Sequence, residues 1–165
     1  MWLPAGNCLT GIRSDPVDVN HSQGEKNVNR TVPFIWPSRV YWEDTDAGGV
    51  VYHAGYLRFF ERARTEWLRG LGIGQQVLRE EHGVVFVVHG MDIRFNRPAR
   101  LDDLLEASVV VTELRSASFK VEQTLRRHAE EPVLVDARVR IACVEPQRWR
   151  PCAIPEFLLQ EISKP

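Results

Sequence analysis

The fold of this chain is decided by one stretch, which reads Tyr41-Trp42-Glu43-Asp44-Thr45-Asp46-Ala47-Gly48-Gly49-Val50-Val51-Tyr52-His53. A short extended run leads into two carboxylates, and the Gly-Gly pair then allows the chain to reverse. The bend can bring Asp46 back towards the first turn of the helix that follows. Backbone amides in that turn have no partner within the helix and carry the positive end of its dipole. A carboxylate beside free amides can attack a carbonyl group and hold the resulting oxyanion.

The segment after this stretch is predicted to be a long amphipathic helix over residues 53–69. Its apolar stripe comprises Tyr56, Phe60, Ala63 and Trp67, widened by Leu57, Leu68 and Leu71. The opposite face carries Arg58, Glu61, Arg62, Thr65, Glu66 and Arg69. Gly70 and Gly72 can end the helix by adopting left-handed conformations. No Ser, Thr, Asp or Asn lies between Val50 and Ala54 to cap the start, so the first amides are expected to stay available.

The rest of the chain has the pattern of an antiparallel sheet. A short strand is expected over 38–42, a second helix over 73–81, and a short terminal helix from Pro155 through Gln160. Four further strands are predicted over 84–95, 105–114, 119–126 and 133–143, the first with a bulge at Gly90. Short turns make these strands antiparallel neighbours. The helix must bury its stripe on the sheet, which predicts an α+β fold with a five-stranded antiparallel sheet wrapped round one long central helix.

Composition indicates an ordinary soluble protein. The 165 residues are 44% hydrophobic and 26% charged, with a net charge of −1. This balance gives no case for nucleic acid or a membrane surface, and no apolar run is long enough to span a membrane. The three cysteines, Cys8, Cys143 and Cys152, have no metal-ligand spacing, which fits a reducing cytoplasm. The start of the chain lacks the basic and apolar blocks of a secretory signal.

Two segments differ in character. Residues 1–33 are rich in Pro, Gly, Asn, Ser and Asp without periodicity, and we expect a disordered or poorly ordered extension that Pro37 closes. Residues 34–165 are expected to form the single domain. Cys143 lies among apolar strand positions and is expected to be a small core residue.

The central stretch, from Arg39 through His53 to Glu66, resembles the hot-dog-fold thioesterases. It is most similar to the 4-hydroxybenzoyl-CoA thioesterase group, and within it to the bacterial acyl-CoA thioesterases associated with the Tol-Pal system. The segment 95–103 also resembles that family, and the likeness covers about 36–157. It implies a hot-dog fold, hydrolysis of acyl-CoA to a free acid and coenzyme A, and no cofactor beyond that substrate. It also implies a homodimer or homotetramer with active sites where subunits meet.

The resemblance assigns roles to particular residues. Asp46 matches the catalytic carboxylate, as nucleophile or general base, and the backbone amide of His53 matches the oxyanion donor. Tyr52 and Tyr56 could line the substrate site. Arg97 and Arg100 are the preferred candidates for holding the coenzyme A phosphates; Arg126, Arg127 and His128 are further candidates.

Other interpretations remain open from the residues alone. An Asp in such a turn usually caps the turn, and Asp44 is expected to be a structural partner. The His53 side chain could be a general base or simply exposed. Two acids without a clustered His or third carboxylate do not indicate a metal site. The alternative functions are a hot-dog hydratase or dehydratase acting on acyl thioesters, and a non-catalytic acyl-CoA-binding module.

Overall fold

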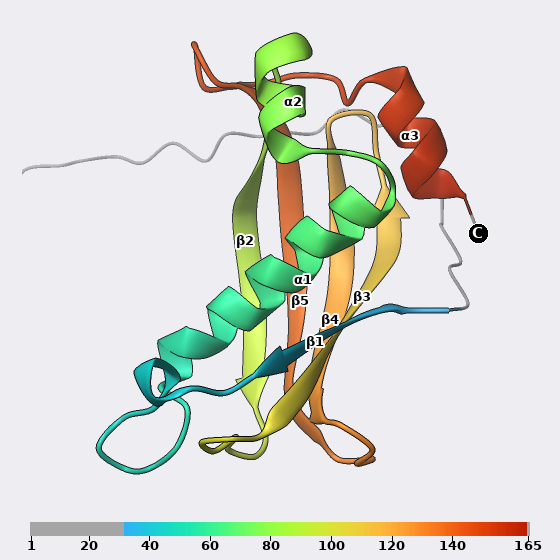
Figure 1. Cartoon of the computed structure of the whole chain (residues 1–165). Coiled ribbons are helices and arrows are strands. Elements are labelled where there is room, and N and C mark those ends of the chain that lie inside the picture. Colours follow the sequence, from blue (N-terminus) through green and yellow to red (C-terminus); the bar gives the residue numbers. More distant parts are fainter. Residues whose placement is uncertain (1–31, 165) are drawn as a thin grey trace, which may run out of the picture.

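A curved antiparallel sheet holds one long helix against its inner face, in a computed structural model that describes residues 32–164 (Figure 1). The helices are α1 (Tyr56–Gly70), α2 (Gln75–Glu81) and α3 (Glu156–Ser163), with short 3-10 turns η1 (Trp42–Asp44) and η2 (His53–Gly55). The strands are β1 (Phe34–Arg39), β2 (Val85–Phe95), β3 (Leu104–Leu114), β4 (Ser118–Arg127), β5 (Val133–Glu145) and β6 (Arg150–Pro151). Nearly all of the expected N-terminal extension lies outside the described residues, and its expected disorder stays a prediction.

The strands follow the order β1-β3-β4-β5-β2, and every pairing is antiparallel. The two-residue strand β6 adds to β5 beside this path. The predicted α+β fold with five main strands is therefore confirmed. The register between β2 and β5 shifts between Val88 and Gly90, which confirms the bulge predicted at that glycine.

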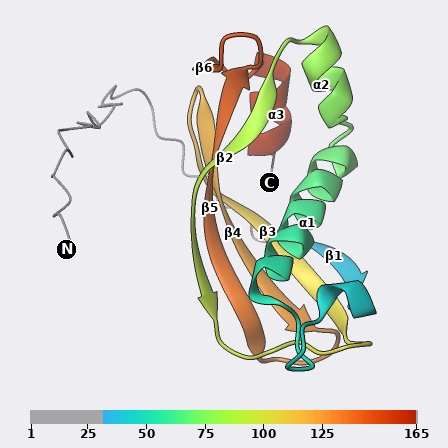
Figure 2. The same ribbon diagram turned by 90° about the vertical axis from the view of Figure 1, so that its left-hand side faces the viewer.

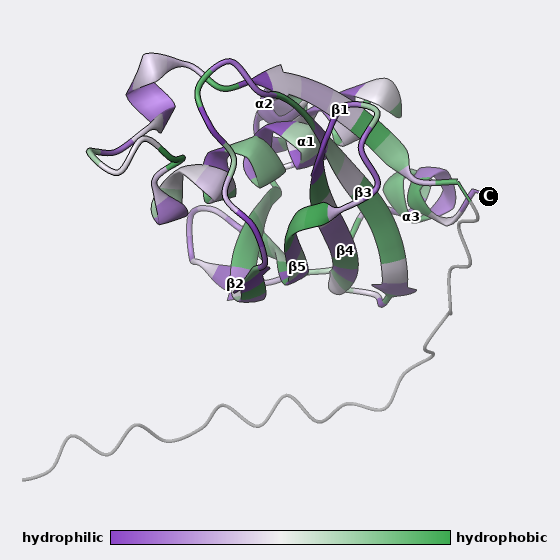
Figure 3. Cartoon of the chain, turned by 90° about the horizontal axis from the view of Figure 1, so that it is seen from below, coloured by the Kyte–Doolittle hydropathy of each residue, from purple (hydrophilic) through white to green (hydrophobic). Residues whose placement is uncertain are grey.

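The core lies between α1 and the inner face of the sheet, as the turned view in Figure 2 shows. Seven residues of α1 are buried: Tyr56, Phe59, Phe60, Ala63, Arg64, Trp67 and Leu68. Figure 3 shows hydrophobic and hydrophilic bands in turn along the strands, as expected for a sheet with one buried face. Each large apolar side chain buried here contributes about 1.5–3 kcal/mol. Leu57 was expected in the buried stripe, but it is 41% exposed.

Several predicted boundaries were wrong. The first strand spans Phe34–Arg39 instead of 38–42, and Pro37 lies inside it. A proline is tolerated there because β1 is the outermost strand, where one backbone edge has no ladder partner. Residues 42–44 form a 3-10 turn. The terminal helix follows Pro155 as predicted but continues to Ser163.

Candidate active site

The loop between η1 and η2 folds back on itself at the end of α1. The Asp46 amide donates to the Val50 carbonyl at 2.9 Å, and the Gly49 amide donates to the Asp46 carbonyl at 3.0 Å. An isolated bridge joins Thr45 to Val51. Gly49 has a φ of 72°, a conformation that glycine adopts without steric cost. The double glycine therefore reverses the chain as predicted.

The Asp46 carboxylate is exposed in the single chain. Its Oδ1 accepts a hydrogen bond from the Gly48 amide at 2.8 Å. No other hydrogen bond to this carboxylate occurs within residues 32–164. A Cβ atom added to Gly48 would lie 3.0 Å from the same oxygen, so the turn favours glycine there. Asp46 thus caps its own turn while remaining open to solvent.

Asp44 has the structural position expected of it. It is 3% exposed, and its Oδ2 accepts a hydrogen bond from the Tyr41 amide at 2.9 Å. Its backbone carbonyl accepts a second bond from the Tyr52 amide at 2.9 Å. Asp44 therefore ties the incoming and outgoing ends of the loop together and fixes where Asp46 can lie.

The start of the helical segment has no side-chain cap. Neither η2 nor α1 receives a capping hydrogen bond from a side chain, as the sequence predicted. His53 opens η2, so its amide has no acceptor inside that turn. No acceptor for this amide is found elsewhere in residues 32–164. A free, uncapped amide suits a carbonyl oxygen or an anion.

A cleft of about 250 Å³ lies beside this amide, lined by Val51, His53, Tyr56, Phe95, Asn96, Arg97 and Pro98. Phe95 forms its aromatic wall, with its ring centroid 5.7 Å from Tyr56 and 6.5 Å from His53. Three of the predicted site residues, His53, Tyr56 and Arg97, therefore meet at one cleft. Tyr52 lies just outside, with its ring 4.3 Å from the His53 ring. Asp46 and Arg100 do not line the cleft.

Tyr56 joins the helix to the loop that forms the opposite wall. Its hydroxyl accepts the Ala99 amide at 2.8 Å, and the Ala99 carbonyl accepts the Val51 amide at 2.9 Å. Burial raises the pKa of the Tyr56 phenol, and the negative charges of Asp103 and Asp46 act in the same direction. The phenol is therefore neutral at pH 7 and serves as a fixed hydrogen-bonding group.

The basic candidates divide into two groups. Arg127 holds the wall, because its Nε donates to Asp103 at 2.7 Å and its Nη2 donates to the Pro98 carbonyl at 2.8 Å. The hydrogen bond to Asp103 raises the pKa of Arg127 above its usual value. Arg126 and His128 are paired with Glu131 and Glu106. The side chains of Arg97 and Arg100 form no ion pair within the described part of the chain, which leaves them open to an anion.

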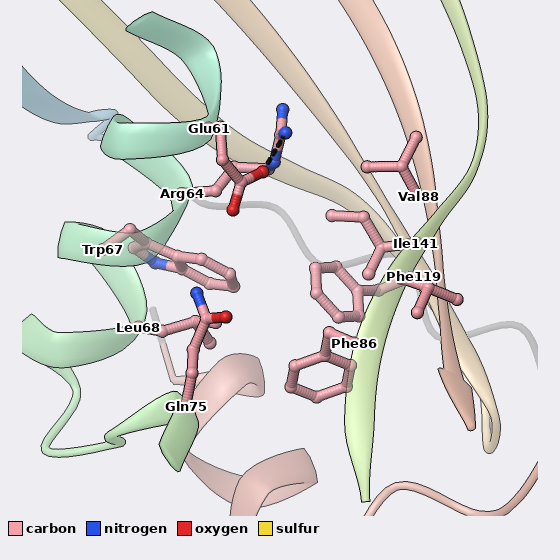
Figure 4. Close-up of a pocket in the computed structure, with 10 residues that line it drawn as sticks. Glu61, Arg64, Trp67, Leu68, Gln75, Phe86, Val88, Phe119 and Ile141 are labelled. Carbon is pink, nitrogen blue, oxygen red and sulfur yellow. Dashed lines mark hydrogen bonds and ion pairs between the residues drawn. The ribbon is translucent and has the colours of Figure 1, made fainter. Parts of the chain in front are cut away.

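A polar network that the sequence did not predict lies deeper along α1, and Figure 4 shows its Glu61 and Arg64 side chains. Arg64 is 6% exposed; it donates to Gln123 Oε1 at 2.6 Å and pairs with Glu61. The Gln123 amide donates to the carbonyls of Phe60 at 3.2 Å and Ser108 at 3.3 Å. Glu61 and Arg64 also border a small cavity of about 30 Å³ whose sheet side is formed by Phe86, Val87, Val88, Phe119 and Ile141. The sequence spacing could have indicated that Arg64 is buried, because residue 64 lies on the same helix face as Phe60 and Trp67.

Two further observations concern the described residues. Within 32–164 no three side chains of His, Cys, Asp or Glu are grouped so that they could hold a metal ion. None of the helices in this range has both the length and the apolar character needed to cross a membrane.

A sheet curled round one central helix, with an uncapped helix start beside a cleft, is the architecture of a hot-dog-fold protein. The family described as "Thioesterase-like superfamily" matches residues 40–162. The Escherichia coli protein named "Acyl-CoA thioester hydrolase YbgC" is 46% identical over 134 residues, which cover 81% of this chain and 98% of that protein. "Acyl-CoA thioesterase YbgC" of Haemophilus influenzae is 50% identical over 123 residues, 74% of this chain and 89% of that one.

A comparison with solved structures leads to the same family. The crystal structure of a probable thioesterase from Bartonella henselae superposes with a TM-score of 0.71 at 40% identity, covering 75% of this chain and all of that one. The chain therefore belongs to the Thioesterase-like superfamily and is a thioesterase of the hot-dog fold, as its central stretch predicted.

Proposed function

We propose that this thioesterase hydrolyses acyl-CoA thioesters to a carboxylic acid and coenzyme A. The observation that carries the proposal is the uncapped His53 amide, which opens beside the cleft next to the loop that bears Asp46. Two relatives that share 46% and 50% of their aligned residues with this chain carry names for acyl-CoA thioester hydrolysis. Arg97 at the rim and the nearby Arg100 supply positive charge for the phosphates of coenzyme A.

In the proposed reaction, the thioester carbonyl oxygen accepts a hydrogen bond from the His53 amide, which stabilises the negative charge that develops on it. Asp46 then acts in one of two ways. As nucleophile it attacks the carbonyl carbon, the C–S bond breaks, the thiolate of coenzyme A leaves, and water hydrolyses the mixed anhydride. As general base it takes a proton from a water molecule that attacks the same carbon, the C–S bond breaks, and the thiolate of coenzyme A leaves with the acid as the other product. A thiolate leaves readily, so the reaction needs no Ser-His-Asp triad.

The proposed role requires the Asp46 carboxylate to reach the substrate from outside the cleft. Its carboxylate lies outside the cleft and is bound only to the Gly48 amide, while its charge is already felt at Tyr56. A second subunit that covers the open side would enclose the substrate between the loop and the cleft. A homodimer or homotetramer is part of the proposal. A cytoplasmic location, inferred from the cysteines, is also part of the proposal, and an association with the Tol-Pal system rests on the family resemblance.

The direct test is Asp46→Asn. The amide oxygen can still accept from Gly48, so the turn is kept while the negative charge is lost. We expect kcat for acyl-CoA hydrolysis to fall by about 10²-fold or more, with little change in the unfolding midpoint. The assay follows free thiol release across a panel of acyl chain lengths.

The matched control is Glu43→Gln, which removes an exposed carboxylate from the same loop region and should leave kcat unchanged. Full activity in Asp46→Asn would refute the assignment of Asp46. Saturable acyl-CoA binding by the wild-type protein without thiol release would indicate a binding module. A change in double-bond absorbance without free thiol would indicate a hydratase or dehydratase.

A further inference from the structure

Two cysteines face each other at the end of the sheet farthest from the cleft. Cys143 lies in β5 and Cys152 directly follows β6. Their sulfur atoms are 3.6 Å apart, and neither cysteine is in a disulfide. The Cys152 amide donates to the Cys143 carbonyl at 3.0 Å. The backbone therefore holds the two thiols side by side on paired strands.

The separation is short enough for a covalent bond. A disulfide requires sulfur atoms at about 2.0 Å and Cβ atoms about 3.5–4.5 Å apart. Residues directly opposite on antiparallel strands have Cβ atoms about 4.5–5.5 Å apart, so rotation of the side chains with a slight approach of the short strand β6 is sufficient. β6 is only two residues long and both of its residues are exposed.

We propose that Cys143 and Cys152 form a reversible intramolecular disulfide when the protein meets a peroxide oxidant. Cys152 is partly exposed, so its thiolate attacks the peroxide first. The O–O bond breaks, giving a sulfenic acid on Cys152, and the released hydroxide takes a proton to become water. The Cys143 sulfur then attacks the sulfenic sulfur, the S–O bond breaks and the S–S bond forms. The proton of Cys143 leaves with hydroxide as a second water.

The different environments of the two thiols support this order. Cys143 is fully buried, and burial, with a further contribution from Cys152, raises the pKa of its thiol to about 12. At neutral pH Cys143 is therefore a protonated thiol that a solvent oxidant cannot reach. The Cys143 sulfur lies 3.6 Å from the more exposed sulfur of Cys152, within reach of a sulfenic acid formed there, and the hydroxide that leaves takes up the Cys143 proton.

The disulfide would fasten the C-terminal segment to the sheet. The chain between β6 and α3 is held by single backbone bonds, such as the 2.7 Å bond from the Ile154 amide to Ser116. α3 buries Leu158 and Ile162 completely. In the ladder Cys143 pairs with Phe86, whereas Phe95 at the cleft pairs with Val135. Oxidation is thus expected to stabilise the C-terminal segment and leave hydrolysis unaffected, and the inference is independent of the proposed function.

The test uses the full-length chain and its Cys8→Ser variant, each oxidised with hydrogen peroxide and digested with trypsin without reduction. Trypsin cuts after Arg140 and Arg148 but not before Pro151 or Pro165, so Cys143 and Cys152 fall in separate peptides, 141–148 and 149–165. We expect these peptides as one linked species, lighter than their sum by two hydrogen atoms and separated by dithiothreitol. The thermal unfolding midpoint should rise on oxidation and return on reduction.

The matched control is Cys152→Ser in the Cys8→Ser background. In this variant the linked peptides should be absent, and oxidation should not raise the thermal unfolding midpoint. The proposal is overturned if Cys152 is recovered as a sulfinic or sulfonic acid while Cys143 remains a free thiol. It is equally overturned if oxidation of the Cys8→Ser chain gives only disulfides between two chains, or leaves both thiols free.

Discussion

The hydroxyl of Tyr56 is a single group that joins two parts of the cleft. Within residues 32–164 it accepts the only hydrogen bond that the Ala99 amide donates, at 2.8 Å, and Ala99 is fully buried. Tyr56→Phe would keep the ring and leave that amide without a partner. We expect the free energy of unfolding to fall by about 1–3 kcal/mol, measured by urea denaturation, and KM for acyl-CoA to rise as the wall loosens.

Tyr52→Phe is the control for this change. Tyr52 is 49% exposed and forms no hydrogen bond through its hydroxyl in the described part of the chain. Removal of the Tyr52 hydroxyl should change the free energy of unfolding by less than about 0.5 kcal/mol. Equal losses of unfolding free energy in Tyr56→Phe and Tyr52→Phe would show that the Tyr56 hydroxyl does not hold the wall of the cleft.

Local chemistry at the residue scale was predictable where neighbours in sequence decide it. The turn at Gly48 and Gly49, the structural role of Asp44 and the missing cap before Tyr56 all follow from adjacent residues. The contact between Arg64 and Gln123 does not, because 59 positions separate them. Only the folded sheet shows that a charged side chain on α1 faces an amide on β4. The catalytic role of Asp46 stays a prediction.

At the scale of elements, α1 carries both the apolar core face and a buried polar network. Arg64→Leu would leave Gln123 Oε1 without its donor at the centre of the sheet. Glu61 is half exposed, so the loss of its ion pair with Arg64 costs little. We expect the free energy of unfolding to fall by about 1–3 kcal/mol, mainly because the amide oxygen of Gln123 is left unpaired. Urea denaturation monitored by tryptophan fluorescence measures it.

A double-mutant cycle separates this network from simple packing. Adding Gln123→Leu removes the unpaired amide, so the double variant should be less destabilised than the sum of the two single changes. Arg58→Leu, on the exposed face of the same helix, is the control and should change stability by less than about 0.5 kcal/mol. Strict additivity of Arg64→Leu and Gln123→Leu would contradict a coupled network.

Element types were predicted better than their ends. The periodicity of α1 and the alternation in β3, β4 and β5 identify these elements because burial on one face imposes the pattern. The predicted limits of β1 were wrong because Pro37 was read as the end of the preceding segment. A proline interrupts a strand only where a backbone N–H is needed for a hydrogen bond to the neighbouring strand. On the outer strand the backbone has a free side, and Pro37 fits opposite Glu106 without loss of the ladder.

At the scale of the whole molecule, the two edges of the sheet are unequal. β1 is six residues long and contains Pro37, which discourages another strand from pairing. β2 is eleven residues long, contains no proline, and among residues 32–164 pairs on one side only, with β5. A long open edge of this kind in a stable protein is normally covered. We therefore expect two chains to associate through β2, about a two-fold axis that sets the strands antiparallel.

This association can be tested with two valines of similar exposure. Val88 on β2 is 48% exposed and Val77 on α2 is 45% exposed. If β2 forms the interface, Val88→Glu places two negative charges near the symmetry axis and weakens the dimer, whereas Val77→Glu leaves it intact. Light scattering on a size-exclusion column should give at least twice the chain mass of 18.9 kDa for the wild type and Val77→Glu, and a lower mass for Val88→Glu. A wild-type mass equal to one chain would contradict pairing through β2, and with it the enclosure of the cleft by a second subunit.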